Sequence, residues 1–329
     1  MPTRIEWTDE TVNVVSGCTP VSEGCEHCYA ERTAPRLAGR FGYPADEPFR
    51  VTLHPDRLAR LFKLRKGKRI FLDSMGDLFH ADVPDEYIAG VLGAVSVAGQ
   101  HDLQVLTKRP ERMAEFFRGH TLLECQKEFI RSPRYDVAWK ILLKPGFRLH
   151  ALDARSIDGA GHYRWPLPNL WLGATAENQA RWEERRDHLR RTPAAVQFLS
   201  AEPLLGPLEL SDEDLRWLDW VIVGGESGPG ARPMQPDWPR KVRDDCAAAG
   251  VPYFFKHWGE YAVCSPEKAG GRQCVLLDRD GEIYGEGWGR NGWADPDAPA
   301  TAIWMARVGK KAAGDLLDGQ RHREFPKAA

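Results

Sequence analysis

Three cysteines near the start of the chain are the residues best suited to chemistry. Cys18, Cys25 and Cys28 have six and then two residues between them, and they follow a short apolar run at residues 12–15. The segment that joins them contains glycine and proline, so it can curl and bring three sulfur atoms together. Cysteine thiolates ligate iron–sulfur clusters and zinc ions. The spacing therefore predicts a metal centre in this loop.

A 4Fe-4S cluster and a zinc ion both suit the three thiols, and the number and spacing of the cysteines favour the cluster. Three thiolates without a fourth nearby suit a 4Fe-4S cluster that keeps one iron open. A structural zinc site closes with four ligands, and His27 lies inside the Cys25–Cys28 pair, where it is poorly placed to serve as the fourth. We therefore expect the cluster, with zinc or unligated thiols as the alternatives. The other cysteines are scattered and are expected to be buried or incidental thiols: Cys125, Cys246, Cys264 and Cys274.

Composition restricts the class of protein. The 329 residues are 42% hydrophobic and 28% charged, with a formal net charge of -2, which excludes a basic field over the whole surface. No run reaches the roughly 18 apolar residues of a membrane span, and the first ten residues lack the apolar core of a secretory signal. We expect a cytoplasmic protein with no membrane partner. The basic run at residues 63–69 is a local candidate for nucleic-acid contact, although such runs are commonly solvated loops.

Alternation of apolar runs and helical patterns predicts the fold. Seven short apolar runs are typical of buried parallel strands, and they lie at residues 12–15, 69–73, 103–107, 170–174, 196–200, 220–224 and 252–256. Helical spacing separates several of them, at residues 84–97, 110–117, 177–191 and 238–249. Alternation of this kind predicts right-handed crossovers in a doubly wound sheet or in an α/β barrel.

Polar clusters at the ends of the strands favour the barrel. Each apolar run finishes in a polar or glycine-rich cluster, and catalytic groups of α/β barrels lie at these strand ends. We therefore predict an α/β fold, a partial or near-complete TIM-like (β/α) barrel of about six to seven parallel strands at residues 1–260. Residues 119–168 are too long for a connection and predict an insertion or a lid over the site. Residues 261–329 form a C-terminal extension, with a hairpin expected around Asp280 and Gly281.

Several segments resemble one protein family. Residues 18–31 (CTPVSEGCEHCYAE) resemble the cluster loop of radical S-adenosylmethionine (radical SAM) enzymes, although the usual loop has three residues between its first two cysteines. More specifically, the sequence is similar to the phage-associated three-cysteine-motif family, which is described as radical-SAM-like. The similarity lies within residues 5–260 and again at 307–314, in segments 74–80 (SMGDLFH), 105–113 (VLTKRPERM), 198–206 (FLSAEPLLG), 221–228 (VIVGGESG), 254–259 (FFKHWG) and 307–314 (RVGKKAAG).

This resemblance implies a radical SAM enzyme. Its cofactors would be a 4Fe-4S cluster and S-adenosylmethionine, and the cluster would generate a 5′-deoxyadenosyl radical with an electron from a donor such as flavodoxin or ferredoxin. The substrate expected by analogy is a nucleic-acid base or nucleotide, which the enzyme would modify or repair, as a lyase or a modifying enzyme. A peptide or small metabolite is a further possibility. The alternative is a non-catalytic zinc- or cluster-binding module that contacts nucleic acid or a protein partner.

Strand-end residues are the candidates for holding S-adenosylmethionine. After the second strand, Asp73, Ser74 and Asp77 are placed to meet the methionyl ammonium, unless Asp77 only caps a helix. Later strand ends offer candidates for the ribose hydroxyls and the adenine, namely Thr175, Glu177, Asn178, Ser200, Glu202, Gly224 and Gly225. Some of these have a structural alternative as helix starts or turns.

Candidates for catalysis are charged residues at the same rim. Glu226 follows Gly224 and Gly225, and Lys108 and Lys256 end two other strands, where they are suited to a phosphate or carboxylate. Ion-paired scaffold lysines are the structural alternative. Lys310 and Lys311 in the C-terminal extension are expected to fold back toward the site.

Overall fold

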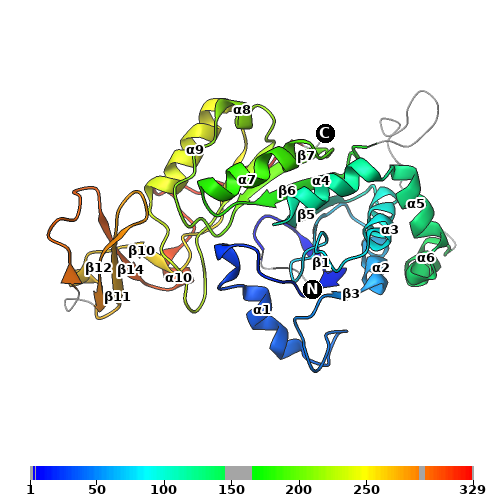
Figure 1. Cartoon of the computed structure of the whole chain (residues 1–329), viewed down its shortest axis with the longest axis horizontal. Coiled ribbons are helices and arrows are strands. Elements are labelled where there is room, and N and C mark those ends of the chain that lie inside the picture. The colour runs from blue at the N-terminus through cyan, green and yellow to red at the C-terminus, as the bar shows by residue number, and fades with distance from the viewer. Residues whose placement is uncertain (1–2, 4, 145–164, 289–292, 328–329) are drawn as a thin grey trace.

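The computed structural model describes residues 3, 5–144, 165–288 and 293–327, and its centre is a sheet of seven parallel strands (Figure 1). The strands are β1 (Glu10–Val12), β4 (Arg69–Leu72), β5 (Asp102–Thr107), β6 (Leu170–Thr175), β7 (Val196–Ala201), β8 (Trp220–Val223) and β9 (Tyr253–Phe255). Their order in space is their order along the chain. The sheet curls into a half-barrel, which confirms the predicted α/β, partial TIM-like fold.

Each predicted apolar run contributes to this sheet because a central parallel strand is covered on both faces. Every residue of β6 and of β8 is buried. The first run differs from the prediction, since β1 ends at Val12 and Val15–Ser16 forms a separate strand, β2. β2 pairs antiparallel with β3 (Thr52–Leu53). The Asp73 carboxylate accepts a hydrogen bond from the Val15 amide at 2.7 Å, which draws the chain out of the main sheet at this point.

Helices connect the strands along the outside of the curl (Figure 1). The four predicted helices are present as α3 (Asp85–Ser96), α4 (Pro110–Gly119), α7 (Gln179–Arg190) and α9 (Asp237–Ala249). The other helices are α1 (Tyr29–Thr33), α2 (Ala59–Lys63), α5 (Leu122–Arg131), α6 (Asp136–Leu142), α8 (Asp212–Leu215) and α10 (Lys310–Ala313). Single 3₁₀ turns lie at Glu23–Cys25, Ala34–Leu37, Pro55–Leu58, Pro133–Tyr135 and Pro266–Lys268.

The two faces of the sheet bury different side chains. Aliphatic residues of the strands pack against the helices, while a second cluster of mostly aromatic residues fills the inner face of the curl: Trp7, Phe71, Trp171, Val196, Phe198, Trp220, Ile222 and Phe254. Phe325 from the C-terminal segment packs against this inner cluster, with its ring 5.3 Å from that of Trp220. Side chains therefore fill the inner face of the half-barrel in the described part of the chain.

The segment that was expected to form a lid packs elsewhere over its described part. α5 lies against α3, and α6 lies against α2, on the outer helical layer. Tyr135 is buried there, with its ring 6.3 Å from that of Tyr87. Residues 145–164 of the predicted insertion lie outside the described residues.

The C-terminal region builds a second sheet of five antiparallel strands. Its order is β10 (Tyr261–Val263), β14 (Ile303–Arg307), β11 (Gln273–Leu277), β12 (Ile283–Trp288) and β13 (Trp293–Ala294). The pairing of β11 with β12 confirms the hairpin expected around Asp280 and Gly281. The division of the chain at residue 260 stays a prediction. Within the described ranges, no helix is both long and apolar enough to cross a membrane.

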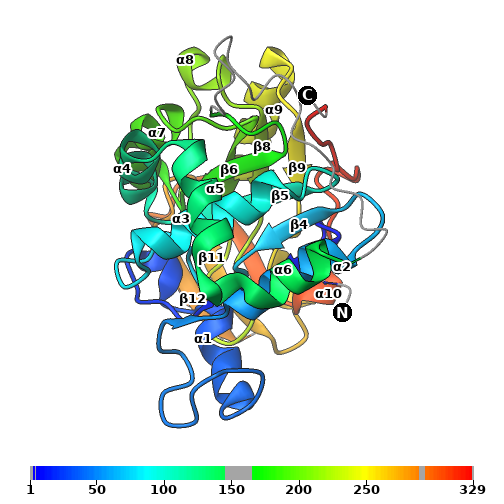
Figure 2. The same ribbon diagram turned by 90° about the vertical axis from the view of Figure 1, so that its right-hand side faces the viewer.

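The last residues of the chain cover the free edge of β9. In Figure 2 the C-terminal segment (red) runs alongside this strand, and the amide of Phe255 donates to the carbonyl of His322 at 3.0 Å. Glu324 returns a bond from its amide to the carbonyl of Tyr253 at 3.2 Å. An exposed strand edge can pair with other chains. The C-terminal segment occupies this edge of β9 and so prevents such pairing.

Candidate functional site

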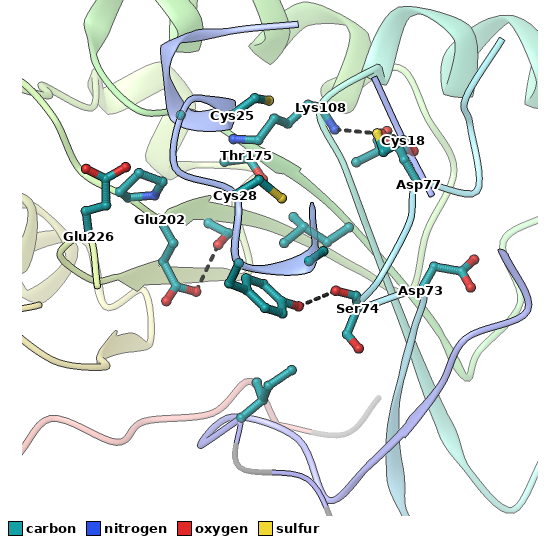
Figure 3. A pocket seen from close by; sticks show the side chains of 18 of the residues that line it. Cys18, Cys25, Cys28, Asp73, Ser74, Asp77, Lys108, Thr175, Glu202 and Glu226 are labelled. Carbon is teal, nitrogen blue, oxygen red and sulfur yellow. Dashed lines mark hydrogen bonds between the residues drawn. The ribbon is translucent and has the colours of Figure 1, made fainter. Parts of the chain in front are cut away.

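A pocket of about 280 Å³ opens at the C-terminal ends of the parallel strands (Figure 3). Most of the predicted site residues line it, from seven separate segments: Cys18, Cys25, Cys28, Asp73, Ser74, Asp77, Lys108, Thr175, Ser200, Glu202, Gly225, Glu226 and Lys256. Glu177, Asn178 and Gly224 are not among its lining residues. Trp7 and Phe71 of the inner aromatic cluster form part of the wall. The curl of the sheet thus gathers side chains that are up to 238 positions apart, from Cys18 to Lys256.

The three cysteines lie around one pocket and none is in a disulfide (Figure 3). All three are half-buried. Burial and the nearby Asp77 carboxylate raise the pKa of the Cys18 thiol and Arg109 lowers it, with a net pKa of about 11. Arg109 Nη1 donates a hydrogen bond to Cys18 Sγ at 3.3 Å. A cation beside a thiol favours the thiolate, which is the form that ligates metals.

The donor set suits an iron–sulfur cluster, although the sulfur atoms are not gathered into a finished metal site. Among the described residues, no group of three or more His, Cys, Asp or Glu side chains is close enough to hold a metal ion. Sites of this kind commonly assemble around the metal itself. The chemistry of three thiols from one loop, which line one pocket, fits cluster ligation. The assignment of Cys18, Cys25 and Cys28 as metal ligands stays a prediction.

Arg109 fastens the start of the cysteine loop to the sheet. Its guanidinium pairs with Asp77 at 3.0 Å and donates to the Thr19 carbonyl at 2.9 Å. Asp77 also accepts from Thr107 Oγ1 at 2.7 Å, so both of its oxygens have protein partners. Burial disfavours the charge of Arg109, but Asp77 and Cys18 raise its pKa above the ordinary value. The structure thus provides a positioning role for Asp77, while its predicted contact with a methionyl ammonium stays untested.

Glu177 fastens the middle of the loop. It is fully buried and forms ion pairs with Lys108 and with Arg185, the second at 3.0 Å. Ser22 Oγ in the cysteine loop donates to Glu177 Oε1 at 2.7 Å. Burial would raise the pKa of this carboxyl, but Lys108, Arg185 and the Ser22 hydrogen bond together hold it below the ordinary value. Lys108 is therefore ion-paired, as the scaffold alternative for this residue expected.

Asn178 caps the helix that follows. Its side chain accepts from the Arg181 amide at 3.1 Å, and its amide nitrogen donates to Glu23 Oε1 at 2.6 Å. Arg181 Nε donates to the second oxygen of the same Glu23 carboxylate at 3.1 Å. The start of α7 thus binds the loop just before Cys25, and the predicted contact of Asn178 with a ribose stays untested.

Glu226 fastens the end of the loop through an arginine. It accepts from Arg232 Nε at 2.9 Å and from Arg232 Nη2 at 2.8 Å, a bidentate pair that fixes the guanidinium plane. Arg232 then donates to the Glu23 carbonyl at 2.8 Å and pairs with Glu26 at 3.0 Å. Both oxygens of Glu226 are thus occupied, and its assignment to catalysis stays a prediction.

Glu202 lies at the opposite side of the pocket from Asp77 (Figure 3) and pairs with Lys256. The Lys256 ammonium lies 2.7 Å from Glu202 Oε1, and Ser200 Oγ donates to Glu202 Oε2 at 3.1 Å. Trp7 Nε1 donates to that same oxygen at 3.3 Å. Gly224 lies directly behind this pair, because a side-chain carbon added there would be 2.9 Å from Glu202 Oε1.

Asp73 and Ser74 complete the second strand end. Asp73 is buried, and its Oδ2 has no hydrogen-bond partner among the described residues. Burial raises the pKa of this carboxyl well above its usual range. In Figure 3 its carboxylate points away from the three cysteines. The Ser74 carbonyl accepts a hydrogen bond from the hydroxyl of Tyr29, the residue after the last cysteine. At another strand end, the Thr175 carbonyl accepts a hydrogen bond from Arg185 at 2.8 Å.

Sequence reasoning missed two of the arginines that hold the loop, Arg185 and Arg232. Arg185 is 2% exposed and lies on the buried stripe of α7 with Trp182 and Leu189. An arginine in an otherwise apolar stripe is a signal for a buried carboxylate partner. Arg232 gave no such signal, because it lies in a loop whose course depends on the whole fold.

Close packing against Glu177 predicts the outcome of a substitution at Gly24. A side-chain carbon added to this glycine would overlap the Glu177 carboxylate, which is held by Lys108 and Arg185. We expect Gly24→Ala to displace the loop and to lower iron incorporation by roughly 10-fold, the scale of losses from residues that orient metal ligands. Iron analysis after anaerobic reconstitution measures this. Gly119→Ala is the matched control, because an added carbon there meets nothing within 4 Å; equal iron in both variants would contradict the prediction.

Comparison with known proteins gives one family and one distant structure. The family model described as "Protein of unknown function (DUF5131)" matches residues 2–326. No curated protein matches the sequence. A solved structure of spore photoproduct lyase complexed with dinucleoside spore photoproduct is similar, with a TM-score of 0.34 and 8% sequence identity. That match covers 71% of this chain, and the chain spans about 59% of the length of the lyase chain.

Proposed function

Since the chain belongs to the DUF5131 family, whose description gives no activity, we propose its function from the site: a radical SAM enzyme that holds a 4Fe-4S cluster on Cys18, Cys25 and Cys28. The finer part of the proposal is that it modifies or repairs a nucleic-acid base or a nucleotide. An external one-electron carrier such as flavodoxin or ferredoxin would supply the reducing equivalent.

One observation carries the proposal: three thiols on one loop line a pocket at the C-terminal ends of a curled parallel sheet. This is the end of an α/β barrel at which catalytic residues are found. The resemblance of residues 18–31 to the cluster loop of radical SAM enzymes supports the same assignment. Zinc would need a fourth ligand; no fourth cysteine lines the pocket within the described part of the chain, but His27 does, so the zinc alternative requires that side chain.

Cys18, Cys25 and Cys28 would hold the cluster by their thiolates. When bound, it would supply the one-electron reduction of S-adenosylmethionine from which radical chemistry starts.

The protein's own contribution is to fix the loop and to enclose the reaction. Three buried or half-buried ion pairs hold the loop from both sides, through Arg109, Glu177 and Arg232. A radical needs a site from which water and stray hydrogen donors are excluded. The aromatic cluster on the inner face of the sheet, in which Trp7 is 2% exposed, closes one side of the pocket.

Polar groups on both sides of the pocket would hold the rest of the cofactor. Asp73, Ser74 and Asp77 lie on one side, and Glu202 lies on the other, in contact with Ser200 and Lys256. Hydroxyl and carboxylate groups are suited to the ammonium and ribose groups of S-adenosylmethionine. The aromatic rings of Trp7 and Phe71 offer an apolar surface for a base.

Product analysis tests the proposal. The full-length protein is reconstituted anaerobically with iron and sulfide, reduced with dithionite and given S-adenosylmethionine, and 5′-deoxyadenosine is quantified. We expect product from the wild type and none from a variant with all three loop cysteines replaced by alanine. A colourless protein with one zinc ion per chain and no sulfide would support the non-catalytic metal-binding module instead.

A further inference from the structure

A second cavity, of about 440 Å³, adjoins the first at the end of β9. The two cavities share Lys256 and His257. Four of the residues that line the second cavity are cations, namely Lys256, Lys310, Lys311 and Arg323. The others are Glu6, His257, Gly314 and Asp315. Sequence analysis expected Lys310 and Lys311 to fold back toward the site, and they do line the space next to it.

Backbone hydrogen bonds fix the tail that carries these cations. The Gly309 amide, just before α10, donates to the Glu260 carbonyl at 3.0 Å. The Trp258 amide donates to the Gly314 carbonyl at 3.1 Å, and Trp258 Nε1 donates to the Leu316 carbonyl at 2.8 Å. Lys310 and Lys311 therefore lie on a short helix, α10, that is held on both sides by hydrogen bonds to Trp258 and Glu260, in the segment that follows β9.

The cavity has more positive charge than its acids neutralise. Glu202 balances Lys256 at 2.7 Å, but Asp315 is shared between Arg321 and Arg323 at 2.9 and 2.8 Å. Lys310 is 3.6 Å from Glu6, and Lys311 has no ion-pair partner among the described residues. In the same part of the chain, Arg323 Nη1 is buried without a hydrogen-bond partner. A donor of this kind is costly unless an acceptor reaches it.

His257 adds a neutral donor beside these cations. Its Nδ1 accepts from the Gly259 amide at 3.0 Å, so the ring hydrogen of the neutral form is on Nε2. Burial and the positive charges of Lys256, Lys310 and Arg323 lower the pKa of this histidine to about 2. The three cations are thus close enough to act on one buried ring.

We propose that the second cavity binds a phosphate group of the substrate while the attached base or nucleoside occupies the pocket beside the cysteines. Ammonium and guanidinium groups bind phosphate through charge-assisted hydrogen bonds. The inference rests on the proposed function for the identity of the substrate, but its phosphate chemistry is independent of the radical reaction. A nucleotide monoester and a phosphodiester in a strand present the same anionic oxygens.

Binding of a fluorescein-labelled oligothymidylate, followed by fluorescence anisotropy, tests this assignment. The variant is Lys310→Gln with Lys311→Gln in the full-length chain, without reductant or S-adenosylmethionine. The matched control is Lys127→Gln with Lys140→Gln, which removes the same charge from two exposed lysines of α5 and α6 on the outer helical layer. We expect roughly tenfold weaker binding for the cavity variant, the scale of a missing hydrogen bond to a charged group. The slope of affinity against salt should become about one unit shallower for each phosphate that the variant no longer binds.

Competition identifies the source of the phosphate. Displacement of the probe by thymidine 5′-monophosphate but not by thymidine would assign a monoester, and displacement by unlabelled strand alone would assign a phosphodiester. The proposal is overturned if the wild type does not bind the labelled strand, if the cavity variant binds it like the wild type, or if the control variant loses as much affinity as the cavity variant. Because the assay contains no radical chemistry, failure to form 5′-deoxyadenosine would count against the proposed function and not against this site.

Discussion

Cys25→Ala is expected to abolish iron and acid-labile sulfide incorporation and, with it, 5′-deoxyadenosine formation. Cys25 lies at the centre of the loop, between Ser22, which contacts Glu177, and Glu26, which pairs with Arg232. Loss of a ligating thiolate leaves two sulfur donors, which cannot hold a cubane cluster at three of its irons. The fall in activity should exceed the roughly 10- to 100-fold that follows from mutation of residues that only orient a ligand.

The matched control for this variant is Cys264→Ala. Cys264 is also half-buried and forms no disulfide, but it follows β10 in the second sheet. Its replacement removes a thiol without touching the pocket, so iron, sulfide and product should match those of the wild type. Undiminished iron and sulfide in Cys25→Ala would remove this cysteine from the cluster.

Glu177→Ala is expected to lower the free energy of unfolding by about 3–5 kcal/mol, the range for removal of one partner from a buried ion pair. Glu177 is fully buried, and Arg185 is buried beside it, so the variant leaves a guanidinium without its counter-charge. It also releases Ser22 and thereby loosens the cysteine loop. Chemical denaturation measures the stability, and iron content measures the effect on the loop.

Glu184→Ala on the same helix is the control for that substitution. Its side chain is 56% exposed and pairs with Arg181 at 2.7 Å, and an exposed pair contributes at most about 1 kcal/mol. Equal stability losses in the two variants would contradict a special role for the buried carboxylate.

The pH dependence of stability should reflect the same group. The folded-state pKa of Glu177 is below the ordinary value of 4.5, so the unfolded chain binds a proton first as the pH falls. The stabilisation is therefore complete above pH 4.5 and is lost as the pH falls through the folded-state pKa. Glu177→Gln should flatten this acid limb, and an unchanged acid limb would place the dependence on other groups.

The sheet was predictable from the sequence because its strands are covered on both sides. Runs such as residues 220–224 are apolar at nearly every position, and the structure buries each residue of β8. The break between β1 and β2 was not predictable, because it depends on the Asp73 carboxylate, which comes from the next strand. The packing of α5 and α6 on the outer layer likewise depends on long-range contacts with α3 and α2.

The location of the site was predictable from the strand ends, but the partners of its charged residues were not. Parallel strands bring their carboxyl ends to one edge, so Lys108, Glu202 and Lys256 were expected to lie together, and they line one pocket. Whether a carboxylate faces a ligand or an arginine depends on residues far along the chain. Glu177 meets Ser22, which is 155 positions away, and Arg232 meets the Glu23 carbonyl, which is 209 positions away. No local pattern contains that information.

The most direct test of the central claim is the electron paramagnetic resonance spectrum of the reduced, reconstituted wild-type protein with and without S-adenosylmethionine. A cluster held by Cys18, Cys25 and Cys28 has one iron without a protein thiolate, so the amino and carboxylate groups of S-adenosylmethionine should bind there and change the spectrum. We expect a 4Fe-4S signal that shifts when S-adenosylmethionine is added. A 4Fe-4S signal that is identical with and without S-adenosylmethionine, or a protein that holds no cluster, would contradict the proposed radical SAM function.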